Sequence, residues 1–233
     1  MLAGGMEPRS TAPKAIFFDA VGTLLYLPKS VGHHYAHAGR TVGLSLDSRA
    51  LDAAFQRVWQ KMPPRPATRL PREDDDKGWW RELAYRVMDE VAPQTNDLDR
   101  DAFFEVAYEH FAEAGVWELY AEVEEVLEQL QTRFQLAVIS NFDGRLRMIL
   151  EQLGLSRFFR AIIISSEVGA DKPDSFIFKR ALNLAGVDAT QALHVGDDPV
   201  HDWQGAAAAG LQVFELKRPQ VTLRELVVAC AAW

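Results

Sequence analysis

Cysteine is almost absent, because Cys230 is the only one among 233 residues. A single thiol forms neither an intrachain disulfide framework nor a zinc site built from several cysteines. Basic residues are also in deficit, since 25 Lys and Arg stand against 33 Asp and Glu and leave a formal net charge of −8. A nucleic-acid-binding face needs a surplus of cations to neutralise phosphates, so we expect no nucleic-acid partner.

Long apolar runs are missing as well, since the longest are the length of one strand, such as residues 161–164. A membrane-spanning helix needs about 20 apolar residues, so we expect no membrane partner. The opening stretch MLAGGMEPRSTAPK has no apolar centre of the kind a signal peptide carries. We therefore expect a loose tail over residues 1–13 and a cytoplasmic protein. A composition of 48% hydrophobic and 25% charged residues is typical of a globular chain.

Short apolar runs that end at polar residues or glycine predict five strands. They cover residues 15–18, 136–139, 161–164, 192–195 and 211–214. Runs that are apolar on both faces are typical of the central strands of a parallel sheet. Helical periodicity alternates with them, over residues 118–132, 146–153, 176–184 and 223–230. This alternation predicts an α/β fold with an open parallel sheet flanked by helices.

The stretch between the first and second strands breaks this pattern. Four helical segments are expected there, over residues 30–40, 47–62, 77–91 and 99–114, with Asp47 and Asp99 as N-caps. The run MPPRPATRLP overlaps the end of the second segment and must be a loop, because its four prolines forbid a continuous helix. We therefore expect an all-helical domain at residues 28–115, inserted into a core domain of residues 1–27 and 116–233.

Polar side chains that could bind a cation and an oxyanion follow four of the predicted strands. Because the carboxyl ends of parallel strands share one edge of a sheet, these side chains are expected to meet there. Carboxylates, a lysine and hydroxyls together suit a divalent cation and an oxyanion. In chain order they are Asp19 and Thr23, Ser140 and Asn141, Lys172, and then Asp197, Asp198 and Asp202.

The order of these segments resembles the haloacid dehalogenase-like hydrolase superfamily. Its four motifs are matched by FFDAVGTL, ISN, KP and GDDPVHD. The further segments SVGHHY, WWREL, SNFD and SSEVGADKPD are most similar to the rhythmically-expressed-gene-2-like branch. The resemblance implies a Rossmann-like core and a helical cap that closes over the active site.

The resemblance also implies a role for each strand-end residue. Asp19 would be the nucleophile that forms an aspartyl-phosphate, and Lys172 would neutralise the charge on Asp19 and on the transferred group. Ser140, Asn141 and, less directly, Thr23 would bind the phosphoryl oxygens.

The cofactor that the resemblance implies is Mg²⁺. An oxygen of Asp19, the backbone carbonyl of Val21 and the carboxylate of Asp197 would hold it, since hard oxygen ligands suit magnesium. Asp198 and Asp202 are both candidates to orient the water molecules on the metal. The residue pattern does not rank one above the other.

Position 21 departs from the family pattern. Phosphate-transferring members carry a second aspartate there, which protonates the leaving group, whereas this chain has Val21. Losing a general acid costs about 10²- to 10⁴-fold in rate. Acyl and aryl leaving groups depart without a proton, so we expect a Mg²⁺-dependent phosphatase for a small phosphorylated metabolite with a good leaving group. Asp143, Glu167 or a histidine of the cap is a candidate substitute acid.

Two alternatives stay open. A 2-haloacid dehalogenase also lacks the second aspartate but needs no metal, whereas the acidic cluster here calls for a cation. A catalytically weak binding or regulatory protein would also tolerate Val21. His33 and His37 have the i, i+4 spacing of a zinc pair, but a third ligand is not evident. We expect a monomer or a homodimer.

Overall fold

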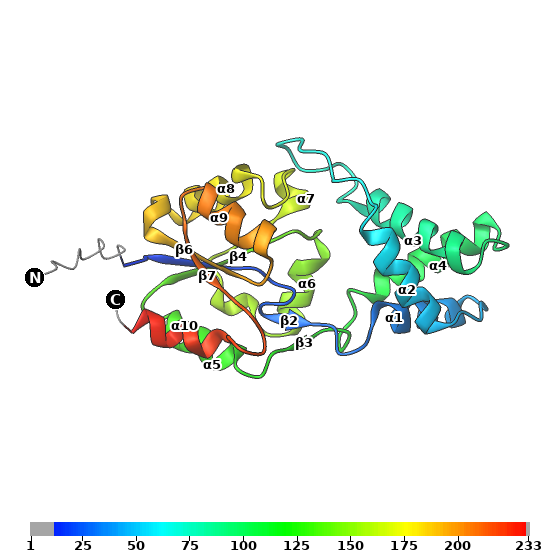
Figure 1. Cartoon of the computed structure of the whole chain (residues 1–233), viewed down its shortest axis with the longest axis horizontal. Helices are drawn as coiled ribbons and strands as arrows, with labels where there is room; N and C mark the ends of the chain where they lie inside the picture. The colour runs from blue at the N-terminus through cyan, green and yellow to red at the C-terminus, as the bar shows by residue number, and fades with distance from the viewer. Residues whose placement is uncertain (1–11, 232–233) are drawn as a thin grey trace, which may run out of the picture.

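The computed structural model describes residues 12–231, so the expected tail over residues 1–13 lies outside the described residues except for its last two. Five parallel strands form the central sheet in the order β5-β4-β1-β6-β7 (Figure 1). They are β1 (Ala15–Phe18), β4 (Gln135–Ser140), β5 (Ala161–Ile164), β6 (Ala192–Gly196) and β7 (Gln212–Glu215). The predicted parallel sheet is confirmed, and each strand begins and ends within one residue of its predicted bounds.

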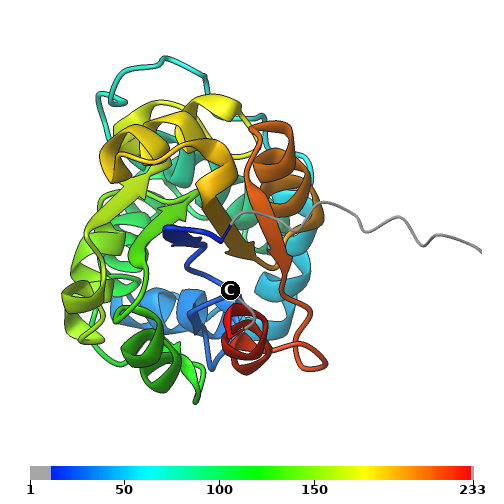
Figure 2. The ribbon, with the colours of Figure 1, turned by 90° about the vertical axis from the view of Figure 1, so that its left-hand side faces the viewer.

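Helices cover both faces of the sheet (Figure 2). Successive side chains of a strand point to opposite faces, so Ile16 and Phe18 of β1 pack on one side and Phe17 on the other. The first face is covered by α5 (Val123–Leu130), α6 (Arg145–Gln152) and α10 (Leu223–Cys230). The second is covered by α8 (Ser175–Ala185) and α9 (Gly205–Ala208).

Several short elements connect these layers. β2 and β3 pair as a small antiparallel sheet where the chain leaves the core for the helical segment and where it returns. The residue pattern did not predict this sheet. A strand of two residues is too short to show periodicity, so the helix expected over residues 118–132 is instead β3 followed by α5. The short elements are β2 (Leu25–Tyr26), β3 (Glu118–Leu119), η1 (Ser156–Phe158), α7 (Ser165–Val168), η2 (Ala189–Gln191) and the π-helical turn η3 (Pro199–Gln204).

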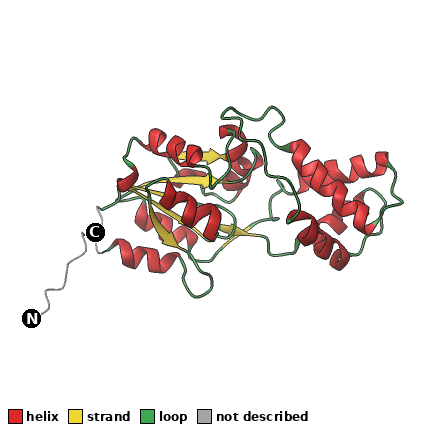
Figure 3. Cartoon of the chain, turned by 45° about the horizontal axis from the view of Figure 1, so that its top comes forward, coloured by secondary structure: helices red, strands yellow, loops and turns green. Residues whose placement is uncertain are grey.

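Four helices form a separate group beyond the sheet edge (Figure 3). They are α1 (Val31–Thr41), α2 (Ser48–Trp59), α3 (Lys77–Val91) and α4 (Asp97–His110). Their inward faces share an apolar cluster of their own, which includes Leu51, Leu83 and Phe103. Asp47 caps α2 as predicted, but the N-cap of α4 is Asn96 rather than Asp99, because the helix begins two residues earlier than expected. In the part of the chain that is described, no helix is long and apolar enough to cross a membrane.

The connection between α2 and α3 leaves the helical group and returns to the core near α7 (Figure 1). We call residues 62–76 the strap; its Pro-rich part is a loop, as predicted. The Arg69 amide donates to the carbonyl of Gly169 at 3.0 Å, and the Arg72 amide donates to the carbonyl of Ser166 at 2.8 Å. A Cβ on Gly169 would lie 2.0 Å from the carbonyl oxygen of Leu70, so the close approach of the strap needs glycine at that position.

Candidate active site

A buried lysine links the carboxylate that follows β1 to a carboxylate in η3, the turn after β6. Lys172 is 3% exposed, and its Nζ donates to Asp19 Oδ1 and to Asp202 Oδ1, both at 2.6 Å. The Ser140 hydroxyl also donates to Asp19 Oδ1, at 3.3 Å. The structure therefore brings four of the predicted site residues into one hydrogen-bonded group.

Asn141 holds the backbone of the lysine in place. Its side-chain oxygen accepts from the Lys172 amide at 2.6 Å, and its Nδ2 donates to the Lys172 carbonyl at 2.9 Å. This pair of bonds ties the loop after α7 to the end of β4. Asn141 thus positions the lysine through its side-chain amide.

The turn after β6 separates the two aspartates that the residue pattern left unranked. Asp202 is 1% exposed, and its carboxylate accepts from His194 Nε2 at 2.8 Å and from the Asp198 amide at 3.1 Å. The Asp198 side chain instead accepts from the amides of Val200 and His201, so it caps η3. A Cβ on Gly196 would lie 2.2 Å from the Asp202 carboxyl carbon, so glycine makes room for this aspartate.

Three carboxylates converge at the same edge of the sheet. One oxygen each from Asp19, Asp197 and Asp202 lies within 4.8 Å of the other two, the one such group of metal-binding side chains among residues 12–231. Gly22 has φ +86°, and a Cβ there would lie 2.4 Å from Asp197 Oδ2, so the loop after β1 fits closely around Asp197. Carboxylate oxygens are the hard ligands that Mg²⁺ prefers, so the chemistry of this donor set fits that ion.

The electrostatics of the group favour a cation. Burial raises the pKa of Asp19 to about 7, and the charges of Asp202 and Asp197 add to that effect while Lys172 opposes it. Burial and the charge of Asp202 also raise the pKa of Asp197. Burial acts in the same direction on Asp202, but Lys172 and His194 outweigh it and hold its pKa below the usual value. One ammonium therefore faces three carboxylates, and a divalent cation would relieve their repulsion.

These residues line a cleft of about 730 Å³ between the sheet edge and the helical group. From the core the cleft is lined by Asp19, Val21, Ser140, Asn141, Asp171, Lys172, Pro173, Asp174, Asp197, Asp198, His201 and Asp202. From the helical side it is lined by Trp59, Met62, Pro63, Pro64, Arg65, Ala67 and Trp79. The Val21 side chain is 37% exposed.

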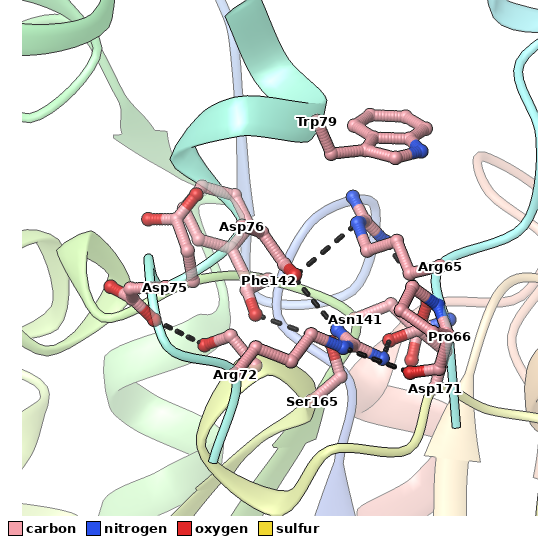
Figure 4. Close-up of polar contacts among 12 residues, drawn as sticks. Arg65, Pro66, Arg72, Asp75, Asp76, Trp79, Asn141, Phe142, Ser165 and Asp171 are labelled. Carbon is pink, nitrogen blue, oxygen red and sulfur yellow. Dashed lines mark hydrogen bonds and ion pairs between the residues drawn. The ribbon is translucent and has the colours of Figure 1, made fainter. Parts of the chain in front are cut away.

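Arg65 of the strap is a site residue that the sequence did not reveal. Its side chain is 8% exposed, forms ion pairs with Asp171 at 3.2 Å and Asp76 at 3.4 Å, and lies 4.2 Å from the Trp79 ring (Figure 4). Arg72 binds the same two carboxylates, at 2.9 and 2.8 Å. Asp171 immediately precedes Lys172, so the strap is anchored beside the lysine. Because residues 65 and 171 are far apart in the sequence, no local pattern of residues predicts their ion pair.

The remaining predicted residues lie away from the cleft. Thr23 is fully buried, and its hydroxyl has no hydrogen-bond partner among the described residues. Asp143 is buried in an ion pair with Arg145 at 2.7 Å, and Glu167 pairs with Arg147 at 2.6 Å. None of the proposed substitute acids lines the cleft, within the described part of the chain.

The histidines near α1 also lie away from the cleft. His34 Nδ1 is 2.9 Å from His110 Nε2, and His33 and His37 are exposed. The histidine that lines the cleft among residues 12–231 is His201, and no motif drew attention to it.

Comparison with known proteins agrees with this architecture. Residues 13–210 match the family model for haloacid dehalogenase-like hydrolase. Haloacid dehalogenase-like hydrolase domain-containing protein 3 from Homo sapiens is 32% identical over 212 residues, which cover 89% of this chain and 83% of that protein. The Rhythmically expressed gene 2 protein of Drosophila melanogaster is 29% identical over 209 residues, or 84% and 80% of the two chains.

A solved structure with the same fold is YfnB from Bacillus subtilis, determined with bound magnesium. The superposition has a TM-score of 0.70 at 18% sequence identity and covers 95% of this chain and 100% of the YfnB chain. Other structures of similar fold include a 2-haloacid dehalogenase and a phosphatase. The fold is therefore shared by a protein described as a dehalogenase and by one described as a phosphatase.

Proposed function

The chain belongs to the haloacid dehalogenase-like hydrolases, and from that premise we propose that it is a Mg²⁺-dependent phosphatase. Its substrate would be a small phosphorylated metabolite with a good leaving group. The observation that carries this proposal is the convergence of Asp19, Asp197 and Asp202 around Lys172 at the cleft. A displacement at carbon needs no such acidic cluster, whereas phosphoryl transfer uses a cation to neutralise charge.

Asp19 is the nucleophile in this proposal. Its carboxylate attacks phosphorus, the bond from phosphorus to the leaving-group oxygen breaks, and the bonding electrons depart with that oxygen. Water then attacks the aspartyl-phosphate, which releases phosphate and restores Asp19. Lys172, bonded to Asp19 at 2.6 Å, opposes the effect of burial on the Asp19 pKa and favours the ionised, reactive form.

We assign the metal to Asp19, Asp197 and the backbone carbonyl of Val21. When bound, Mg²⁺ would neutralise phosphoryl and carboxylate charge at this edge of the sheet. Asp202 is the better candidate to assist, because it lies among the converging carboxylates, whereas Asp198 is occupied as the cap of η3. Asp202 also holds Lys172 and therefore orients the ammonium group.

Phosphoryl oxygens would be bound by Ser140, which lies beside Asp19, and by amides at the end of β4. The Asn141 side chain supports them indirectly, through its two bonds to the Lys172 backbone. Buried Thr23 would act at most through the loop after β1. Residues 28–115 are the cap in this proposal, and the strap holds the cap against the core at Asp171.

The proposal is tested by phosphate release from acetyl phosphate, p-nitrophenyl phosphate and glucose 6-phosphate, with Mg²⁺ or with EDTA. We expect release only with Mg²⁺, and fastest from the first two substrates. A second readout needs no turnover: Mg²⁺ at 100 times its Kd should stabilise the protein against unfolding by about 2–3 kcal/mol. Asp197→Asn should lose that stabilisation, and Asp47→Asn, whose side chain caps α2 far from the cleft, should keep it.

The opposite results identify the alternatives. Release of halide from a 2-haloacid in EDTA, with no phosphate release, would replace the proposal by dehalogenation. If neither phosphate nor halide is released, and Mg²⁺ binds to the natural chain but not to Asp197→Asn, the protein would be a binding protein that kept the metal site.

Val21→Asp is expected to restore the missing proton donor. Because Val21 is 37% exposed and lines the cleft, an aspartate there would reach the leaving group without being buried. We expect kcat/KM for glucose 6-phosphate to rise about 10- to 100-fold and that for acetyl phosphate to change little, since the acyl leaving group needs no proton. Val228→Asp on α10, at a position 74% exposed, is the matched control. An equal change on both substrates would contradict this explanation of position 21.

A further inference from the structure

A second cavity adjoins the catalytic cleft and is almost entirely apolar. It has a volume of about 330 Å³ and lies between the core and the helices α1–α4. Its lining, which we call the aromatic pocket, consists of Val21, Leu27, Val31, Tyr35, Phe55, Trp59, Trp80, Phe104, Ala107, Tyr108, Phe111, Trp117, Asn141, Phe142 and Arg145. Val21, Trp59 and Asn141 line the cleft as well, so the two cavities meet beside the proposed nucleophile.

The charges of the aromatic pocket are already neutralised. Of the described residues that line it, Arg145 alone is charged, and its guanidinium pairs with Asp143 at 2.7 Å and donates to the Tyr108 carbonyl at 2.7 Å. The same guanidinium stacks on the Tyr108 ring at 3.6 Å. The Asn141 amide is engaged by the Lys172 backbone. A second anionic group on the substrate would therefore find no free cation in the pocket.

A polyhydroxylated substrate fits this lining poorly. Each sugar hydroxyl would give up its hydrogen bonds to water and find few replacements, which costs free energy. A flat apolar ring would instead bury its surface against the aromatic side chains of the lining. Hydrogen-bonding groups without a charge are few, because the lining adds the hydroxyls of Tyr35 and Tyr108 and the indole of Trp80, whose Nε1 is buried with no hydrogen-bond partner among the described residues. These few groups suit a ligand with one or two polar atoms.

We propose that the aromatic pocket binds the leaving group of the substrate and that this group is an aryl alcohol of one or two rings. The substrate class would then be aryl phosphates; this inference rests on the proposed phosphatase function. The volume of about 330 Å³ lies at the small end of ligand pockets and suits one or two rings. The valine at position 21 also favours aryl phosphates, because a phenolate leaves without the proton that a valine side chain is unable to supply. An acyl phosphate shares that property, but a small acyl group would leave the pocket unfilled.

The first experiment measures binding without turnover. Isothermal titration calorimetry with 1-naphthol, the dephosphorylated leaving group, is expected to show one site per chain. Ala107→Phe on α4 would fill the pocket, and Val31→Trp at the partly exposed start of α1 would narrow it. Both variants should weaken 1-naphthol binding about 10-fold or more. Ala53→Phe makes the same chemical change at an exposed position on α2 outside the pocket and should leave binding unchanged. A thermal unfolding midpoint for each variant shows whether it is folded.

The second experiment compares kcat/KM for 1-naphthyl phosphate and for acetyl phosphate. The ratio of the two constants is expected to fall about 10-fold in the pocket variants, because only the naphthyl substrate uses the pocket. Two results would overturn the inference while phosphate release from acetyl phosphate still supported the phosphatase proposal. One is that 1-naphthol does not bind, and the other is that the folded pocket variants leave the ratio of the two constants unchanged. A third result is that Ala107→Phe weakens 1-naphthol binding but no phosphate ester or acyl phosphate releases phosphate. That result would retain the aryl site and overturn its role in phosphoryl transfer.

Discussion

Replacing Asp19 with asparagine is expected to lower kcat/KM for p-nitrophenyl phosphate by about 10⁴-fold or more, because the variant lacks the carboxylate that we propose as the nucleophile. Asparagine keeps the shape of the side chain and retains an oxygen for Lys172 and Ser140, which both donate to Asp19 Oδ1. The fold should therefore persist. Phosphate release and circular dichroism measured on the same sample test both statements.

The same variant makes a prediction about pH. Burial raises the pKa of Asp19 from 3.8 to about 7, so this group favours folding below its unfolded pKa and loses that contribution as the pH rises through 7. In EDTA at pH 8, Asp19→Asn should be at least as stable as the natural chain, because it removes a buried charge. The difference should shrink at pH 5, where the folded protein binds the proton. Urea unfolding at the two pH values measures it.

Asp47→Asn is the matched control, because it makes the same change at an N-cap where asparagine performs as well as aspartate. It should retain full activity and the same pH dependence as the natural chain. Substantial turnover by Asp19→Asn would exclude an aspartyl-phosphate at this position.

Replacing Lys172 with methionine is expected to affect stability as well as activity. The ammonium is buried between Asp19 and Asp202, and removing one partner of a buried ion pair costs about 3–5 kcal/mol, since the remaining charges have no compensation. Activity should fall about 10²- to 10³-fold or more, as when a donor that stabilises the transition state is removed. The urea midpoint measures the first effect, and phosphate release at saturating Mg²⁺ measures the second.

Lys179→Met is the control for this substitution. Lys179 is exposed on the neighbouring helix α8, so the same change there should alter the free energy of unfolding by less than about 0.5 kcal/mol. A loss below about 1 kcal/mol in Lys172→Met would mean that the two carboxylates find other compensation in the folded protein.

Local sequence patterns determined the core of this protein. The central strands β1, β4 and β6 are short runs buried on both faces, and such runs stand out in the sequence without knowledge of their neighbours. Parallel strands end at a common edge, so the residues that follow them were expected to meet, and Asp19, Ser140 and Lys172 do. The absence of a proton donor at position 21 is also a property of the sequence alone.

Tertiary structure decided the rest of the site. Asp198 and Asp202 are close in the sequence, and the residue pattern does not distinguish them. In the folded chain Asp202 is buried against Lys172 and His194, whereas Asp198 caps η3. Arg65 reaches Asp171 from a loop more than a hundred residues away in sequence. The aromatic pocket is assembled from side chains of α1–α4, of α6 and of the loops that connect these helices to the core strands. Contacts between residues so far apart depend on how the elements pack, and a local pattern of residue types carries no record of that packing.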